Sequence, residues 1–262
     1  MVEGFGPPLI TLHSSARSSR DEFKEVIPIL AQKYRVIGMD TLGYGDSDPP
    51  AEPPELEDYA KTVVMLMDKE DIGKANVLGR HTGAFIAMEL AATYPERLDK
   101  LILSEPHYHD EAMRKGEEVQ AFFRTWVKFW KEWLNVGVKD DGSHFMEAWE
   151  TLKEHDPSVP PSLLNRVICD ALKAGEQSTY AYYAIFRHPM EKRIPLIQCP
   201  TLLMWGTKDV RTFDLGGPME KTNEIIKRRK VVYIEDGTFF QTNLMPEKFA
   251  QPVLEFLENP GV

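Results

Sequence analysis

A histidine, His81, stands at the centre of a short glycine-flanked turn, residues 79–83 (Gly-Arg-His-Thr-Gly). The apolar residues 75–78 before it are typical of a buried strand, and residues 84–92 after it are typical of a buried helix. Glycines let a strand turn sharply into a helix and hold the central residue in a strained, exposed position. A neutral imidazole there, with a pKa of about 6.5, is suited to abstract a proton or to activate water at physiological pH.

The segments around this turn alternate between strand-like and helix-like patterns, which predicts an α/β fold with a parallel sheet covered on both faces. The expected strands lie at residues 9–13, 34–40, 75–78, 101–104, 200–206 and 230–234. The expected helices of this alternation lie at residues 21–32, 56–70, 84–92 and 246–257.

Four segments together resemble the landmarks of the α/β-hydrolase superfamily, in an order that spans nearly the whole chain. They are residues 12–15, residues 40–48, the turn at 79–83 and residues 205–209. The turn has the spacing of G-x-S-x-G, the nucleophile elbow of that fold. The central residue in the family is usually serine and sometimes aspartate or cysteine, whereas this chain carries His81. The resemblance implies an α/β-hydrolase fold with a mostly parallel sheet and an inserted helical cap.

The resemblance also implies where a catalytic triad would lie, and two of its three members are missing. Asp209 follows a late strand at the spacing that the family uses for its acid. The family histidine usually stands seven residues before the proline that opens the last helix, and counting back from Pro246 gives Phe239. No histidine follows His188. We therefore expect a degenerate triad and not a standard serine hydrolase.

His81 needs a partner to fix its tautomer if it is to act as a base. Glu105 is the favoured candidate, because it ends the strand expected beside the one that leads to His81, a position from which some family members take their acid. Asp209 is the other candidate, at a greater expected distance. Backbone amides near His81 would stabilise a developing oxyanion. The expected donors belong to Ser14, Ser15 and Thr82.

The alternation of strands and helices is interrupted between residues 106 and 195, where the family inserts its cap. Residues 1–105 and 196–262 are then the α/β-hydrolase core. Only eight residues precede Leu9, so the N-terminal strand hairpin of the family is expected to be absent and the sheet shortened at that edge. An uncovered sheet edge favours pairing with another chain, which makes a homo-oligomer one expectation.

An aromatic-rich helix is predicted within the cap, over residues 121–134, with its apolar residues at helical spacing. One interpretation is that this stripe only packs the cap onto the core. The other is that it roofs an apolar pocket for a small molecule, since such pockets favour aromatic walls. The residues predicted to contact a substrate are Trp126, Phe129, Trp130, Tyr183 and Phe239.

The composition argues against some classes of binding partner. A formal net charge of −10 argues against nucleic acid or an anionic membrane surface as the ligand. The two cysteines have no metal-ligand spacing and form no disulfide framework, which fits a cytoplasmic protein. No cofactor or metal is expected, and the start of the chain lacks the pattern of a signal peptide.

Three functions fit these residues. The favoured one is a cofactor-free enzyme in which His81 is a general base or nucleophile on a small carbonyl compound, either an ester, lactone or diketone hydrolase or a lyase. The second is a catalytically inactive binder of a small apolar ligand. The third is a metal-assisted hydrolase that would use His81, Glu105 and either His107 or His109.

Overall fold

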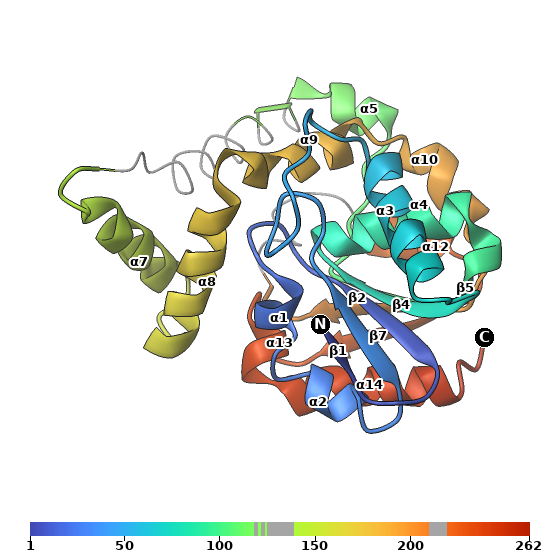
Figure 1. Ribbon diagram of the computed structural model, residues 1–262. Helices are drawn as coiled ribbons and strands as arrows, with labels where there is room; N and C mark the ends of the chain where they lie inside the picture. The colour runs from blue at the N-terminus through green and yellow to red at the C-terminus, as the bar shows by residue number, and fades with distance from the viewer. Residues whose placement is uncertain (118–119, 122–123, 125–138, 210–218) are drawn as a thin grey trace.

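One twisted sheet organises the molecule (Figure 1). The structure, a computed structural model, describes residues 1–117, 120–121, 124, 139–209 and 219–262. In that part of the chain the sheet has seven strands in the order β1-β3-β2-β4-β5-β6-β7. Their bounds are β1 Val2–Glu3, β2 Pro8–Leu12, β3 Arg35–Met39, β4 Ala75–Arg80, β5 Leu98–Ser104, β6 Thr201–Gly206 and β7 Arg229–Ile234. Strands β2 to β7 are parallel, which confirms the predicted α/β fold.

The edge beside β3 is longer by one strand than the sequence predicted. Val2 and Glu3 pair antiparallel with Ile37 and Val36, so a short strand is present there. Two residues are too few to show an alternating hydrophobic pattern, and both side chains are exposed. Strand β1 therefore has no recognisable pattern in the sequence.

The helices around the sheet follow the predicted pattern with one difference. The helices α3 (Leu56–Lys69), α4 (Thr82–Thr93) and α14 (Pro246–Glu258) lie where expected. The helix expected over residues 21–32 is instead two short ones, α1 (Ser19–Glu22) and α2 (Ile27–Leu30). Pro28 lacks a backbone N–H and disfavours the interior of a helix, and here it lies in the first turn of a new helix, α2.

Each face of the sheet has its own apolar core. On one face, side chains of α3 and α4 such as Val63 and Phe85 pack against the strands. On the other, side chains of α2 and α14 such as Leu30 and Phe249 do the same. Outside residues 106–195, the described chain also has α12 (Met219–Ile225), α13 (Gln241–Leu244) and the short 3₁₀ helix Pro95–Arg97. No helix in the described ranges is long and apolar enough to cross a membrane.

The segment predicted as the cap carries helices and no strand within its described residues. These are α5 (Glu111–Lys115), α7 (Ser143–His155), α8 (Pro161–Ala174), α9 (Tyr180–Arg187), α10 (Met190–Arg193) and two 3₁₀ turns, Gly175–Thr179 and Ile194–Leu196. The pair α7 and α8 extends away from the sheet (Figure 1). A small third core joins this pair to the loop after β2 through Ala16.

Four strands deliver polar residues to a single edge of the sheet. Because parallel strands end on the same side, the residues that follow β2, β4, β5 and β6 lie near one another. These residues are the loop 13–18, His81, Glu105 and Asp209.

Candidate active site

The turn at His81 is a strained strand-to-helix connection. His81 has a φ of 44°, which is unusual for a residue with a side chain. A Cβ on Gly79 would lie 2.2 Å from the carbonyl oxygen of Gly83, and one on Gly83 would lie 2.0 Å from that of Leu12. Only glycine fits at both positions, so the two glycines let β4, α4 and β2 approach closely and hold His81 at the tip.

The partner of His81 is Asp209. The imidazole Nε2 lies 3.1 Å from Oδ2 of Asp209, whose side chain is fully buried. Because a carboxylate only accepts hydrogen bonds, the neutral imidazole donates through Nε2–H. The lone pair is then on Nδ1, and 14% of the His81 side chain is exposed to solvent. This arrangement is that of an oriented base.

Glu105, the partner favoured by the sequence, is held elsewhere. Its Oε1 accepts hydrogen bonds of 2.7 Å from the backbone N–H of Gly206 and from Nε2 of Gln241. The register explains this: Ser104 lies opposite Met204, so the next residue along β5 faces the end of β6. Glu105 therefore connects the end of β5 to β6 and α13, and His81 contacts Asp209 instead.

Burial lowers the pKa of His81 below its usual value of 6.5. The Asp209 carboxylate opposes this shift, and the neighbouring Arg80 guanidinium adds to it. The net effect favours a neutral imidazole at pH 7, which is the form that accepts a proton.

A second histidine, His107, lies close to the same helix turn. Its ring centroid is 4.4 Å from that of Phe85. Phe85 belongs to the first turn of α4, directly after His81. Burial holds its pKa well below the usual range, and His109 and His81 lower it further. The Nε2 of His109 lies 3.0 Å from the carbonyl oxygen of Ile185. Among the residues that the structure describes, no three His, Cys, Asp or Glu side chains are grouped to hold a metal ion.

The predicted oxyanion loop is partly committed to other contacts. The amide of Ser14 donates to Oε2 of Glu22 at 2.6 Å, so its N–H is not free for a substrate oxygen. This corrects the prediction for Ser14. The amide of Ser15 donates to Oγ1 of Thr82 at 3.2 Å, a longer bond that a substrate oxygen would have to replace, and the two hydroxyls are 2.7 Å apart. The amides of Ser15 and Thr82 remain predicted donors.

Phe239 lies where the family resemblance placed a missing histidine, and it contacts His81. The two rings are 5.1 Å apart between centroids. Its predicted substrate role stays a prediction, as does that of Tyr183, a half-buried residue of α9. The other three residues predicted to contact a substrate, Trp126, Phe129 and Trp130, lie outside the described residues.

A buried ion pair that the sequence did not predict lies beside His81 and Asp209. Arg80 and Glu22 are both inaccessible to solvent and are joined by a bond of 2.6 Å between Nη1 and Oε1. Burial alone would raise the pKa of Glu22, but Arg80 and Arg17 outweigh it and hold that pKa at about 2. The only sequence signal was the position of Arg80 directly before His81.

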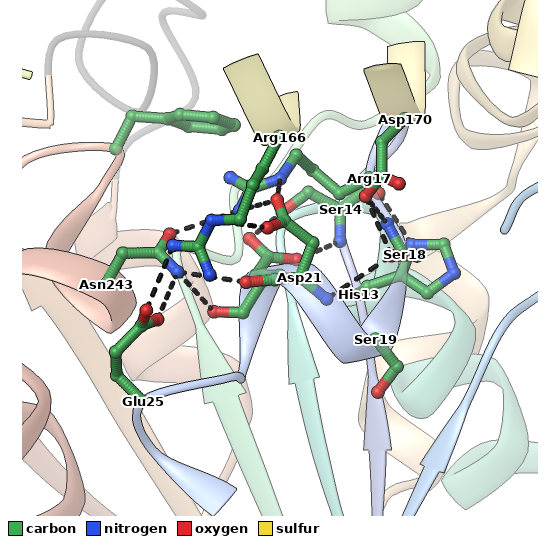
Figure 2. A network of polar contacts seen from close by, with 12 residues as sticks. His13, Ser14, Arg17, Ser18, Ser19, Asp21, Glu25, Arg166, Asp170 and Asn243 are labelled. Carbon is green, nitrogen blue, oxygen red and sulfur yellow. Dashed lines mark hydrogen bonds and ion pairs between the residues drawn. The ribbon is translucent and has the colours of Figure 1, made fainter. Parts of the chain in front are cut away.

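A polar network secures the loop after β2 to helix α8 (Figure 2). Arg17 donates to Asp21 at 2.7 Å, and Arg166 of α8 donates to Glu25 at 2.9 Å. Asp170, also of α8, accepts from both the amide and the hydroxyl of Ser18 at 2.7 Å. These bonds connect the loop that carries Ser14 and Ser15, and the residues that follow it, to α8.

An open pocket of about 510 Å³ lies beside this network, between the first residues, α1 and α8. Its lining includes Arg20, Lys24, Arg166 and Asp170, and it includes neither His81 nor Asp209. Because Arg166 and Asp170 already have partners in the network, we do not place the active site there.

Comparison with known proteins agrees with this architecture. A family model described as alpha/beta hydrolase fold matches residues 7–242. A pimeloyl-[acyl-carrier protein] methyl ester esterase of Neisseria meningitidis is 26% identical over 257 residues, which cover 92% of this chain and 74% of that protein. A 2-hydroxymuconate semialdehyde hydrolase of Pseudomonas sp. is 35% identical over 103 residues, 38% of this chain and 36% of that enzyme.

Other similarities are either partial or at the level of the fold. A Mycobacterium tuberculosis protein is 32% identical over 102 residues, and the match spans 30% of its length. A bromoperoxidase from Bacillus anthracis has a TM-score of 0.82 and 22% identity, over 99% of this chain and 94% of that one. An enol-lactonase from Burkholderia xenovorans has a TM-score of 0.72 and 21% identity, over 99% and 95%.

Proposed function

The chain belongs to the α/β-hydrolase fold family, and from the chemistry of its elbow we propose that His81 is a general base on a small carbonyl compound. The observation that carries the proposal is the 3.1 Å contact between Nε2 of His81 and Oδ2 of Asp209. It orients the ring, fixes the Nε2–H tautomer and leaves Nδ1 as the base.

Hydrolysis of an ester or lactone illustrates the chemistry. Nδ1 of His81 takes a proton from water, and the resulting hydroxide adds to the carbonyl carbon. The amides of Ser15 and Thr82 stabilise the tetrahedral oxyanion, while Asp209 stabilises the imidazolium. When the intermediate collapses, the alkoxide leaves and takes the proton back from Nδ1. The same base would remove an acidic proton from a diketone, which is the first step of a lyase reaction.

The substrate class follows from the surroundings of the base. Phe239 and Phe85 lie near the imidazoles of His81 and His107 and add apolar surface beside the base. The charges beside His81, those of Asp209 and Arg80, already have partners within the protein. The esterase and enol-lactonase named above are consistent with carbonyl chemistry on this fold. We therefore favour an uncharged, largely apolar ester, lactone or diketone, with no cofactor.

The test is a screen of wild-type protein and His81→Ala against activated esters, lactones and enolisable diketones. We expect turnover by the wild type alone, and no labelling of either protein by a serine-directed phosphonate. Thermal melts with each compound report binding, since a ligand stabilises the folded state.

The contact between Phe239 and His81 favours one other function, a ligand binder without turnover, because an apolar ring stands where the family has its catalytic histidine. If compounds stabilise both proteins and neither turns them over, the binder is correct and the enzyme proposal fails.

A further inference from the structure

Arg80 occupies the centre of a buried charge network directly behind His81. It is the last residue of β4, and none of its side chain is exposed. Nη1 donates to Oε1 of Glu22 at 2.6 Å, and Nη2 donates to the carbonyl oxygen of Phe239 at 2.7 Å. Nη2 also lies 3.6 Å from the same Oδ2 of Asp209 that receives His81.

We infer that Arg80 is a positioning residue of this site: it holds the Asp209 carboxylate as the acceptor for His81 and couples it through Glu22 to the oxyanion loop. The inference concerns the same site as the proposed function and rests on it for its catalytic meaning.

The contacts of Arg80 and Glu22 involve three loops. Glu22 accepts from the amide and the hydroxyl of Ser14, at 2.6 and 2.7 Å, which places the loop after β2. The bond to the Phe239 carbonyl places the loop after β7, and the contact with Asp209 places the loop after β6. Through Arg80, the residues expected to bind an oxyanion and the residues that orient the base therefore share one rigid support.

Arginine has the geometry for this role. Its guanidinium is planar, permanently charged, and presents its donors in a fixed fork, so it addresses several acceptors at defined angles. Lysine carries the same charge as a point on a flexible stem. Burying Arg80 and Glu22 costs desolvation that apolar residues of similar volume would avoid, so space filling alone does not explain the pair.

The charges around His81 give a readout that a merely structural arginine would not move. Asp209 from the loop after β6 and Glu22 from α1 favour the imidazolium. Arg80 from β4 disfavours it, and His107 from the loop after β5 is a further titratable group near His81. Loss of the Arg80 charge alone raises the pKa of His81, whereas release of Asp209 removes both a charge and a hydrogen bond and lowers that pKa. Because Arg80 holds Asp209, we expect its removal to release the carboxylate and to lower the pKa of His81 overall.

The first experiment measures how fast diethyl pyrocarbonate modifies His81 as a function of pH, with the site identified by mass spectrometry. This reagent reacts with the neutral imidazole, so the midpoint of the profile reports the pKa. The comparison is between Glu22→Gln and the double variant Glu22→Gln/Arg80→Met, since both lack the Glu22 charge. We expect a lower midpoint in the double variant, because Asp209 is released. An equal or higher midpoint in two folded proteins means that Asp209 keeps its place without Arg80, and it overturns the inference.

The second experiment uses Arg80→Lys, which keeps the positive charge and changes only the geometry of the hydrogen-bond donors. It remains available if the double variant does not fold. Two-bond ¹H–¹⁵N spectra report the tautomer of His81 in Arg80→Lys. The matched control is Arg17→Lys, because Arg17 is equally buried but pairs with Asp21 and Asn243. We expect Nδ1–H tautomer to appear in Arg80→Lys and not in the control. Retention of the Nε2–H tautomer alone in both variants contradicts the positioning role.

Neither experiment needs a substrate, so the two claims fail separately. A lowered midpoint without turnover of any compound supports the positioning role and removes the proposed function. Turnover by the wild type with an equal or raised midpoint supports the proposed function and overturns the positioning role. If a substrate is found, kcat in Arg80→Lys falls on the order of 100-fold while KM changes little, because misplacement of the base affects the chemical step.

Discussion

The Nε2 of His81 lies 3.1 Å from Oδ2 of Asp209, although the two residues are separated by 128 positions in the chain. The contact joins the end of β4 to the loop after β6, across β5. In the family pattern a histidine after the last strand would stand between the nucleophile position and this acid. Here the elbow residue is itself the imidazole, and it reaches the acid directly.

The pH profile of activity tests that contact. Burial lowers the pKa of His81 below 6.5, so kcat/KM stays high through neutral pH and falls only as pH drops through that lowered pKa. Asp209 raises the pKa of His81, so Asp209→Asn moves the falling limb to still lower pH and reduces the plateau on the order of 100-fold. A limb at the same pH in both proteins would separate Asp209 from the titrating group.

Glu105→Gln reports stability more than base chemistry. The amide oxygen of glutamine can accept the two bonds that Oε1 now receives from Gly206 N–H and Gln241 Nε2, but it is a weaker acceptor than a carboxylate. We expect the free energy of unfolding to fall by about 1–3 kcal/mol in urea titrations. The His81 profile with diethyl pyrocarbonate should keep its midpoint. A displaced midpoint with unchanged stability would restore Glu105 as the partner of the base.

Glu89 of α4 is another buried carboxylate, and its contacts predict that the protein loses stability in acid. The carboxylate accepts hydrogen bonds from Nε2 of His188 at 2.7 Å and from Nη2 of Arg193 at 2.6 Å. Burial would raise the pKa of Glu89, but these donors and Thr93 hold it at about 2. Because the folded pKa is lowered from 4.5, this stability is present above pH 4.5 and is lost as pH falls toward 2.

Glu89→Gln should therefore cost about 3 kcal/mol at pH 7 and flatten the loss of stability between pH 4.5 and 2. Glu258→Gln is the matched control, because Glu258 forms an exposed ion pair with Lys33. The control should change stability by less than about 0.5 kcal/mol. The measurement is thermal unfolding of the wild type, Glu89→Gln and Glu258→Gln as a function of pH. An equal effect of the two substitutions would refute a special role for Glu89.

The close packing at the elbow is tested by adding one methyl group. A Cβ on Gly83 would lie 2.0 Å from the Leu12 carbonyl oxygen, whereas one on Gly73 would meet no atom within 4 Å. Gly83→Ala should lower the free energy of unfolding by about 3 kcal/mol, and Gly73→Ala should leave it within about 0.5 kcal/mol. Indistinguishable unfolding curves for the two variants would mean that the chain does not approach so closely there.

The parallel sheet was predictable because its strands are short apolar runs bounded by glycine, proline and polar residues. The strands expected at residues 101–104 and 200–206 are within three residues of β5 and β6. The exceptions have local causes. β1 has two residues, and Pro28 divides a helix whose apolar pattern looked continuous.

The site was only half predictable. The spacing of glycines located His81, and the position after a late strand located Asp209. The choice between Asp209 and Glu105 was not predictable, because it depends on which carboxylate the Gly206 amide and Gln241 occupy. Likewise, nothing in the sequence indicates that Glu22 takes the amide of Ser14 or that Arg80 meets Phe239, since those pairs are set by tertiary packing.

The most direct measurement of the central claim is kcat/KM for wild type and His81→Gln on the best substrate from the screen. Glutamine keeps a polar side chain at the elbow but cannot take up a proton. We predict that His81→Gln loses activity on the order of 10²- to 10⁴-fold, with the stabilisation by bound substrate retained. Equal rates in the two proteins would show that His81 is not the base.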